Sequence, residues 1–449
     1  MAERAGERWA AALETWLAPF LAAMNHKARR RWAPLYVRGL IEPGERQSIQ
    51  PMAARVSPAD TDQLHHFISS PVWDSTPLET ILGQAADRLV GGSDAVLVID
   101  DTALPKKGTH SVGVAPQYAG ALGKQANCQT LVSLTLARNE VPVPVALRLF
   151  LPEVWTGDRE RMRRAGVPDD HQKPKTKPEI ALAELDRLRR AGVRFGAVLA
   201  DAGYGNSARF RLGLSQRKLL WAVGILKVQN VYSTAVELQW PIARTGRPRK
   251  HPVPSEAPVA AESALEDAAW RRIEWRRGTK GPLQAEFAAT RVRPAEGAQL
   301  RTGWHAPGEE VWLVGERRAS GERKYYLCNL PADTPVETGA ALIKARWVCE
   351  QAHQQMKEEL GLDHFEGRSW TGLHRHALLT MIAFGFLQHL RLEQSRTERG
   401  KKPDRPTTAT DPARRPARTP RAARSPREAP MSLLPSLHRR ASAGMNLPK

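Results

Sequence analysis

Two apolar segments of this 449-residue chain end directly on aspartates, and they constrain the fold more than any other feature. Residues 95–99 read Ala-Val-Leu-Val-Ile before Asp100 and Asp101, and residues 195–200 run into Asp201. Short continuous apolar runs bounded by polar residues are typical of strands buried on both faces of a sheet. We therefore expect an α/β fold whose central sheet carries acidic side chains at its strand ends.

The segments around these two runs alternate between strand and helix patterns. In chain order they are strands at 95–99, 128–137 and 141–150, a helix at 177–190, a strand at 195–200, a helix at 207–214 and a strand at 219–225. Arg138-Asn139-Glu140 has the composition of a hairpin turn between the second and third strands. Later segments predict paired strands at 311–316 and 324–329 and long helices at 338–360 and 373–392.

The chain is strongly basic, with 67 Lys and Arg against 47 Asp and Glu and a formal net charge of +20. Half of this excess lies after residue 395, where 14 basic residues face 4 acidic ones among nine prolines. A basic folded part points first to a polyanionic partner, most often nucleic acid, although a basic protein can also be merely soluble and cationic.

The cysteines and the apolar segments indicate the compartment. Cys128, Cys328 and Cys349 lie far apart, so neither a disulfide framework nor a four-cysteine zinc site is expected, and a reducing compartment fits. The apolar run at 377–387 is too short to cross a bilayer, and acidic residues interrupt the N-terminal 24 residues, unlike a signal peptide. We expect a cytoplasmic protein without a membrane segment.

Three acidic residues are candidates for chemistry. Asp101 and Asp201 follow strands, and Mg²⁺ prefers such carboxylate oxygens together with substrate phosphates. Two such ions could clamp a phosphodiester, but a strand-end Asp is also a common start of a turn. Arg346, Glu350 and Lys357 are spaced four and seven apart, so they share one helical face. Glu350 could complete a metal site while Arg346 and Lys357 contact phosphates, or Arg346 and Glu350 could form an ordinary surface pair.

These motifs resemble the DDE transposases of bacterial insertion sequences, most closely the insertion-sequence-701 type, which is related to the insertion-sequence-4 group. The likeness spans about residues 25–395. Its motifs are Asp101-Thr102, Ala202-Gly203-Tyr204-Gly205 after Asp201, the Arg346–Glu350–Lys357 spacing, and the longer stretches 99–108, 110–114 and 361–370.

The resemblance implies a ribonuclease-H-like core in which Asp101, Asp201 and Glu350 are catalytic and bind two Mg²⁺ ions, with Mn²⁺ able to substitute. It implies hydrolysis at the ends of a transposon, followed by attack of the freed 3′-hydroxyl on target DNA. The implied partner is double-stranded DNA, held by a homodimer in the synaptic complex and, within the bacterial cell, near the nucleoid.

The expected organisation has five parts. They are a helical N-terminal DNA-binding region at 1–90, the first part of the catalytic core at 91–238, a basic linker and β-rich insertion at 239–335, the helical end of the core at 336–395, and a disordered basic tail at 396–449.

The chain departs from the family pattern in three places. Ile343 stands where related groups have a Tyr three residues before the Arg, the tail after residue 396 is unlike a family C-terminus, and Asp100 competes with Asp101 as the first metal ligand. The Asp-Thr match favours Asp101, and Asp100 is expected to point to the opposite face of its strand.

Further candidates for DNA contact lie outside the acidic triad. Lys106, Lys107 and Lys124 flank the first strand, and Arg247 lies in an Arg-Thr-Gly-Arg-Pro-Arg-Lys segment that resembles a minor-groove AT-hook. Trp275 could stack a flipped base. Two alternative functions stay open: a catalytically inactive DNA-binding protein derived from a transposase, and a host nuclease of the same fold.

Overall fold

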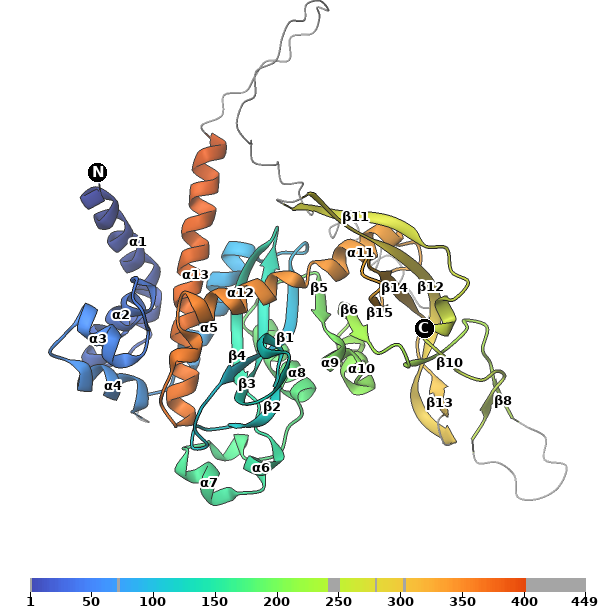
Figure 1. Ribbon diagram of the computed structural model, residues 1–449, viewed down its shortest axis with the longest axis horizontal. Helices are drawn as coiled ribbons and strands as arrows, with labels where there is room; N and C mark the ends of the chain where they lie inside the picture. The colour runs from blue at the N-terminus through green and yellow to red at the C-terminus, as the bar shows by residue number, and fades with distance from the viewer. Residues whose placement is uncertain (1, 71–72, 241–250, 279–280, 302–303, 401–449) are drawn as a thin grey trace, which may run out of the picture.

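A computed structural model describes residues 2–70, 73–240, 251–278, 281–301 and 304–400, and it joins an N-terminal helical part to one large mixed sheet (Figure 1). The helices expected in the first 90 residues are present, whereas DNA binding by this region stays a prediction. Its helices are α1 (Ala2–Ala22), α2 (Lys27–Ile41), α3 (Ile49–Val56), α4 (Thr61–Ser69) and α5 (Thr76–Val90).

The elements that carry the strand-end aspartates follow in the predicted order. They are β1 (Val96–Pro105), β3 (Lys124–Arg138), β4 (Val141–Leu149), α8 (Lys177–Arg190), β5 (Ala197–Ala200), α10 (Ala208–Gln216) and β6 (Leu220–Ile225). The β3–β4 turn has positive φ at Asn139 (50°) and Glu140 (63°), which is typical of a tight hairpin. The shorter elements β2 (Ala115–Ala119), α6 (Glu153–Thr156), α7 (Arg159–Arg164) and α9 (Ala202–Gly205) were not predicted.

The β-rich insertion continues the same sheet. The strand order is β10-β7-β12-β14-β15-β6-β5-β1-β3-β2, with β4 paired to β3 and with β11 and β13 paired to β12. Its strands in this sheet are β7 (Asn230–Tyr232), β10 (Val259–Ala260), β11 (Arg271–Gly278), β12 (Gly281–Arg301), β13 (Trp304–Pro307), β14 (Val311–Arg317) and β15 (Arg323–Cys328). β8 (Leu238–Gln239) and β9 (Val253–Pro254) form a separate two-stranded sheet. The predicted pair at 311–316 and 324–329 is confirmed as β14 and β15, which pair antiparallel.

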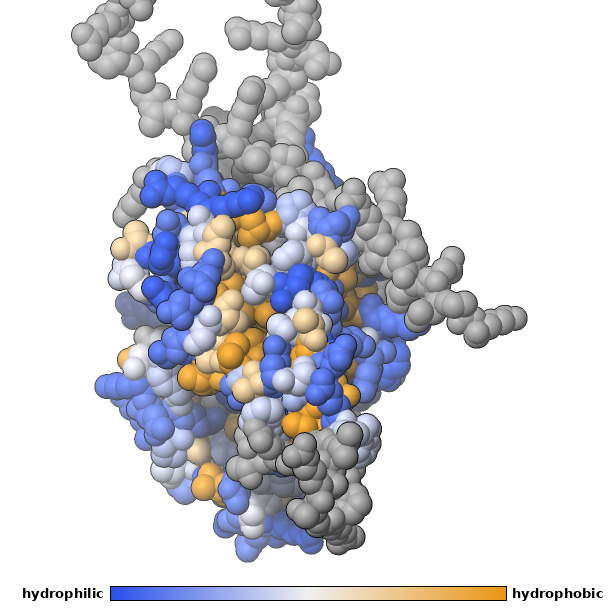
Figure 2. Space-filling model, turned by 90° about the vertical axis from the view of Figure 1, so that its right-hand side faces the viewer, coloured by the Kyte–Doolittle hydropathy of each residue, from blue (hydrophilic) through white to orange (hydrophobic). Residues whose placement is uncertain are grey.

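The sequence did not predict the hairpin of β11 and β12. Both strands carry many charged and polar residues, and Pro294 and Gly297 interrupt the pattern of β12, so neither shows a long apolar run. Figure 2 shows the β-rich end of the molecule, where apolar and hydrophilic side chains are interspersed over the surface. Exposed apolar residues of this region include Leu238, Trp240 and Val259.

The single helix predicted at 338–360 is wrong. Two helices, α11 (Val336–Lys344) and α12 (Trp347–Glu358), are separated at Ala345 and Arg346. α11 packs against β11, β12 and β6, whereas α12 packs against β4 and β1. The break therefore lets one stretch of chain cover two parts of the sheet, and it places Arg346 at the junction.

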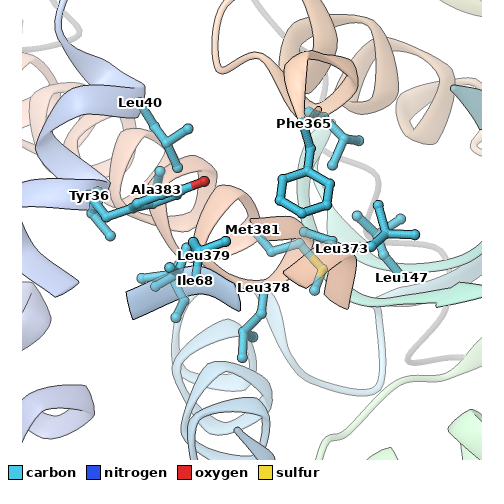
Figure 3. Packing of buried hydrophobic residues seen from close by; sticks show 14 of the residues in the cluster. Tyr36, Leu40, Ile68, Leu147, Phe365, Leu373, Leu378, Leu379, Met381 and Ala383 are labelled. Atoms are coloured by element: carbon cyan, nitrogen blue, oxygen red, sulfur yellow. The ribbon is translucent and has the colours of Figure 1, made fainter. Parts of the chain in front are cut away.

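The last helix, α13 (Trp370–Gly400), contains the apolar run at 377–387. It lies between the N-terminal helices and β4, so its first half is buried on several sides (Figure 3). Tyr36 and Ile68 approach it from the N-terminal helices, and Leu147 approaches from β4. The predicted helix at 373–392 is confirmed and is longer at both ends.

The expected tail begins within this helix, because α13 continues to Gly400. The remainder of the tail, residues 401–449, lies outside the described residues. No helix in the described ranges is long and apolar enough to cross a membrane.

Candidate active site

The aspartates that follow the two apolar runs are brought together by the pairing of β1 and β5. These strands run parallel, and their last aligned pair is Ile99 with Ala200. Asp100 and Asp201 follow that pair directly. Asp201 follows the end of β5, whereas β1 continues to Pro105, so Asp100 and Asp101 lie within β1, paired with Ser133 and Val132 of β3. The expectation that the first strand ends at these aspartates is therefore wrong, although the parallel pairing of β1 with β5 still brings them close to Asp201, and we call this group of three aspartates the rim.

Asp100 and Asp101 face opposite sides of β1, also as predicted. The Asp100 carboxylate accepts hydrogen bonds from the Arg346 guanidinium and, at 3.2 Å, from the Cys349 thiol, so it faces α12. The Asp101 carboxylate accepts from the Tyr204 hydroxyl and from the Lys177 ammonium, both at 2.5 Å, so it faces the starts of α8 and α9. The Asp100 oxygens are thus already engaged by α12, whereas Asp101 is the more exposed of the two, at 29% against 14%.

Asp201 is half-buried and caps the short helix α9. One carboxylate oxygen accepts from the backbone N–H of Gly203 at 3.0 Å and from that of Tyr204 at 3.4 Å. The pKa of Asp201 is raised from 3.8 to about 6, mainly by burial and then by the negative charge of Asp100. The rim therefore holds more negative charge than its surroundings neutralise.

Arg346 connects the helix to this rim. Its guanidinium donates to Asp100 and, at 2.5 Å, to Glu350 one turn further along α12. The Glu350 side chain is 60% exposed and is the most accessible carboxylate of the group. The predicted common face of Arg346 and Glu350 is confirmed, but Arg346 is engaged by carboxylates in this structure.

The donor set suits a hard divalent cation. Asp101, Asp201 and Glu350 offer only carboxylate oxygens, the ligands that Mg²⁺ prefers. Burial raises the pKa of Asp100 as well as that of Asp201, so an added cation at this rim would relieve electrostatic repulsion. Across the described ranges no three acidic, histidine or cysteine side chains already stand at metal-ligand geometry. Arg346 and Lys177 occupy carboxylate oxygens that a cation would take.

The predicted DNA-contacting lysines differ in their surroundings. Lys106 donates to the backbone carbonyls of Asp363 (3.1 Å) and Phe365 (2.7 Å), and burial lowers its pKa, so its ammonium ties β1 to the segment after α12. Lys107 and Lys124 are exposed near β1. Lys357 is half-buried on α12, where burial lowers its pKa.

Two further predicted DNA contacts are those of Arg247 and Trp275. Arg247 lies outside the described residues. Trp275 is partly buried, packs edge-on against Phe287 at 5.9 Å between ring centroids, and has the Lys344 ammonium 4.5 Å from its ring. The Lys344 ammonium thus lies over the ring, and the stacking of a flipped base on Trp275 stays a prediction.

Four residues near the rim were missed as site residues in the sequence. Lys177 and Tyr204 hold Asp101, and Cys349 contacts Asp100. His353 bonds Ser133 of β3 through a 2.7 Å contact between Nε2 and Oγ, which fixes α12 on the sheet. Burial lowers the pKa of His353 to about 3, so it is neutral. Only Tyr204 had a signal in the sequence, the Ala-Gly-Tyr-Gly motif.

Gly205 in that motif allows α9 to pack closely on β6. A Cβ at position 205 would lie 1.9 Å from the carbonyl oxygen of Gly224. We expect Gly205→Ala to lower the free energy of unfolding by about 1–3 kcal/mol, the usual cost of overpacking, as measured by urea denaturation. Gly339→Ala is the matched control, because a Cβ there meets no atom within 4 Å inside helix α11. The control should be neutral or stabilising by up to about 1 kcal/mol, and equal losses in both variants would contradict the packing argument.

The comparisons of the sequence with a family model and with a curated relative agree with these motifs. The family model described as "DDE superfamily endonuclease" matches residues 19–282. The chain is 32% identical over 329 residues to a "probable transposase for insertion sequence element IS701" from Microchaete diplosiphon, covering 73% of this chain and 74% of that protein. A cryo-EM structure of the piggyBac transposase synaptic complex with hairpin DNA matches at a TM-score of 0.40 and 10% identity, over 88% of this chain and 74% of that one.

Proposed function

The chain belongs to the DDE superfamily of endonucleases and transposases, together with the insertion-sequence-701 transposase, and from this we propose that it cuts DNA at transposon ends and joins them to target DNA. It is an enzyme of the nuclease and transposase class. The proposed reaction is metal-dependent hydrolysis of a phosphodiester at each end, followed by attack of the freed 3′-hydroxyl on the target strand.

A ribonuclease-H-like core is part of this proposal. The strands β4, β3, β1, β5 and β6 are neighbours in that order, with β1 parallel to β5 and antiparallel to β3. This arrangement supports a core in which the first aspartate lies on the first strand, β1, and the second lies at the end of the fourth, β5.

We assign the metal ligands to Asp101, Asp201 and Glu350. When bound, two Mg²⁺ ions would stabilise the charge on the attacking and leaving oxygens of the phosphodiester, and Mn²⁺ could replace them. Both aspartates accept hydrogen bonds, and Asp101 is preferred because its side chain is the more exposed and because the Asp-Thr motif matches the family.

The surrounding residues position these carboxylates and the DNA. Tyr204 orients Asp101 through its hydroxyl, and the Gly203 N–H orients Asp201. Arg346 keeps Glu350 beside the strand ends. We assign DNA phosphate contacts to Arg346, Lys357, Lys107, Lys124 and Arg247, and we propose that two copies of the chain hold the paired ends. Lys106 contacts only backbone carbonyls in the described residues, so its predicted phosphate contact would require that it leave them.

One observation carries the proposal: Asp100 and Asp101 of β1 lie beside Asp201 at the end of β5, since, after burial, the charges of both raise the pKa of Asp201, and Arg346 joins Glu350 of α12 to Asp100. A DNA-binding protein without catalysis has no use for such a concentration of carboxylates, whose mutual repulsion costs stability. This argues against the inactive-binder alternative.

The test uses labelled duplex DNA that carries the inverted repeats flanking the coding region, with Mg²⁺ or Mn²⁺. A transposase should nick at the repeat ends and give joined products with a target plasmid. Cutting without joined products would favour the host-nuclease alternative, and binding without cutting would favour the inactive DNA-binding protein.

A further inference from the structure

We propose that residues 159–177 form a strip that binds the phosphate backbone of duplex DNA and leads it to the Asp101 side of the site. The inference rests on the proposed function, because it assumes that the rim acts on DNA. We call this segment the α7–α8 strip. It contains seven Lys and Arg against three Asp and Glu.

The strip is fixed in place at both ends. At the α7 end, Arg161 donates to the Thr109 carbonyl at 2.8 Å and stacks 3.9 Å from the ring of Trp155, which itself bonds the Val114 carbonyl. These contacts hold α7 against the loop that follows β1. At the other end, Lys177 reaches the Asp101 carboxylate.

The start of α8 is also defined. Thr176 caps the helix in a capping box with Glu179, so the helix begins at Lys177. Residues 174–176 before it belong to no helix or strand, and Pro174 favours an extended Lys173. Lys173 and Lys175 both line one hollow of about 60 Å³ beside Trp370, and the Lys175 ammonium donates to the Asp170 carbonyl at 3.4 Å.

Several basic groups of the strip are available to a ligand. Arg159, Arg163, Lys173 and Lys175 are exposed, and none of them forms an ion pair with another described residue. The strip keeps a net positive charge despite the exposed Glu160, Asp169 and Asp170, and it ends at Asp101. Such a segment fits the polyanionic backbone of DNA, because its cations attract phosphates and the acidic rim repels them unless a metal ion is present.

The test is equilibrium binding of a fluorescent duplex of mixed sequence, measured by anisotropy over a range of salt concentrations with EDTA present. The variant is Arg163→Gln/Lys173→Gln/Lys175→Gln, which leaves Lys177 intact. We expect binding to weaken by about tenfold or more and the slope of log K against log salt to fall by about 2.7, or about 0.9 per lost phosphate contact.

The matched control removes the same charge elsewhere, as Arg189→Gln/Arg190→Gln/Lys218→Gln. These exposed residues include the far end of α8, about 20 Å from Lys177 at 1.5 Å per residue. Their loss should change affinity less than threefold. A strip variant that binds as the wild type does, or a control that weakens binding equally, would overturn the proposal.

A charge-preserving variant is the control for misfolding. Arg163→Lys/Lys173→Arg/Lys175→Arg should bind DNA like the wild type, whereas a fold defect would persist. Because the assay contains no metal, it is independent of cleavage. If the strip variant loses DNA binding but the wild type does not cut DNA in the cleavage assay, only the proposed function is refuted. If the wild type cuts DNA but the strip variant binds as the wild type does, only the strip is refuted.

Discussion

Asp201→Asn should abolish cleavage of transposon-end DNA, with a loss of at least about 10³-fold in the rate of strand nicking. Asn keeps the capping oxygen that Gly203 and Tyr204 contact, so α9 should persist. It removes the negative charge that a metal ligand needs. The measurement is single-turnover nicking with Mg²⁺ and with Mn²⁺, with circular dichroism as the check on folding.

The same substitution should stabilise the metal-free fold. Folding raises the pKa of Asp201 from 3.8 to about 6, so above pH 6 the folded protein holds a carboxylate that burial disfavours. At 1.36 kcal/mol per pKa unit this costs about 2–3 kcal/mol at pH 7. Asp201 therefore favours folding below its unfolded pKa, and this benefit is lost as the pH rises through about 6.

In EDTA at pH 7, Asp201→Asn should raise the free energy of unfolding by about 2 kcal/mol, and the gain should vanish towards pH 4. Asp186→Asn is the control of opposite sign, because the hydrogen bond from Arg217 lowers the pKa of Asp186. That control should be slightly less stable than the wild type at pH 7. A destabilised Asp201→Asn protein that still cuts DNA would refute both the burial argument and the catalytic assignment.

We expect substitutions of the two adjacent aspartates of β1 to differ in their effect on DNA cleavage. Asp101→Asn should reduce nicking by about 10³-fold or more, whereas Asp100→Asn should reduce it by less than about tenfold. Asn at position 100 can still accept the Arg346 hydrogen bond, so α12 should stay in place. Both variants are compared in the single-turnover nicking assay, with thermal unfolding as the check on integrity.

A reversed order would reassign the first ligand. If Asp100→Asn is inactive and Asp101→Asn cuts DNA normally, the ligand set becomes Asp100, Asp201 and Glu350, on the side of β1 that α12 covers. Equal and small losses in both variants would remove β1 from the site altogether.

The sequence predicted the part of the fold in which pattern and packing agree. The buried strand β5 and the first half of β1 show continuous apolar runs, because a strand buried on both faces has no polar period, and Asp201 and Asp100-Asp101 follow these runs. The second half of β1 was missed because these aspartates look like a strand end. The break at Arg346 could not be predicted, since neither Gly nor Pro occurs at 345–346 and the cause is tertiary. β12 was missed because its many polar residues interrupt the alternation of apolar and polar side chains that is typical of a strand, although it pairs within the large sheet.

The candidate site was predictable to the same extent. Spacing placed Arg346 and Glu350 on one face, and alternation placed Asp100 and Asp101 on opposite faces, because both depend only on local geometry. The contact of Lys177 with Asp101 joins positions 76 residues apart. Lys106 satisfies backbone carbonyls more than 250 residues away. Such partners depend on the tertiary fold, so a single sequence carries no signal for them.

Direct titration of Mn²⁺, followed by electron paramagnetic resonance in the presence of transposon-end DNA, tests the central claim most closely. The account predicts two bound ions per chain in the wild type, with binding weakened by at least about tenfold in Asp201→Asn and in Glu350→Gln. It predicts wild-type binding in Asp186→Asn, whose carboxylate pairs with Arg217 away from the rim. Unchanged number and affinity of bound ions in Asp201→Asn and Glu350→Gln would contradict it.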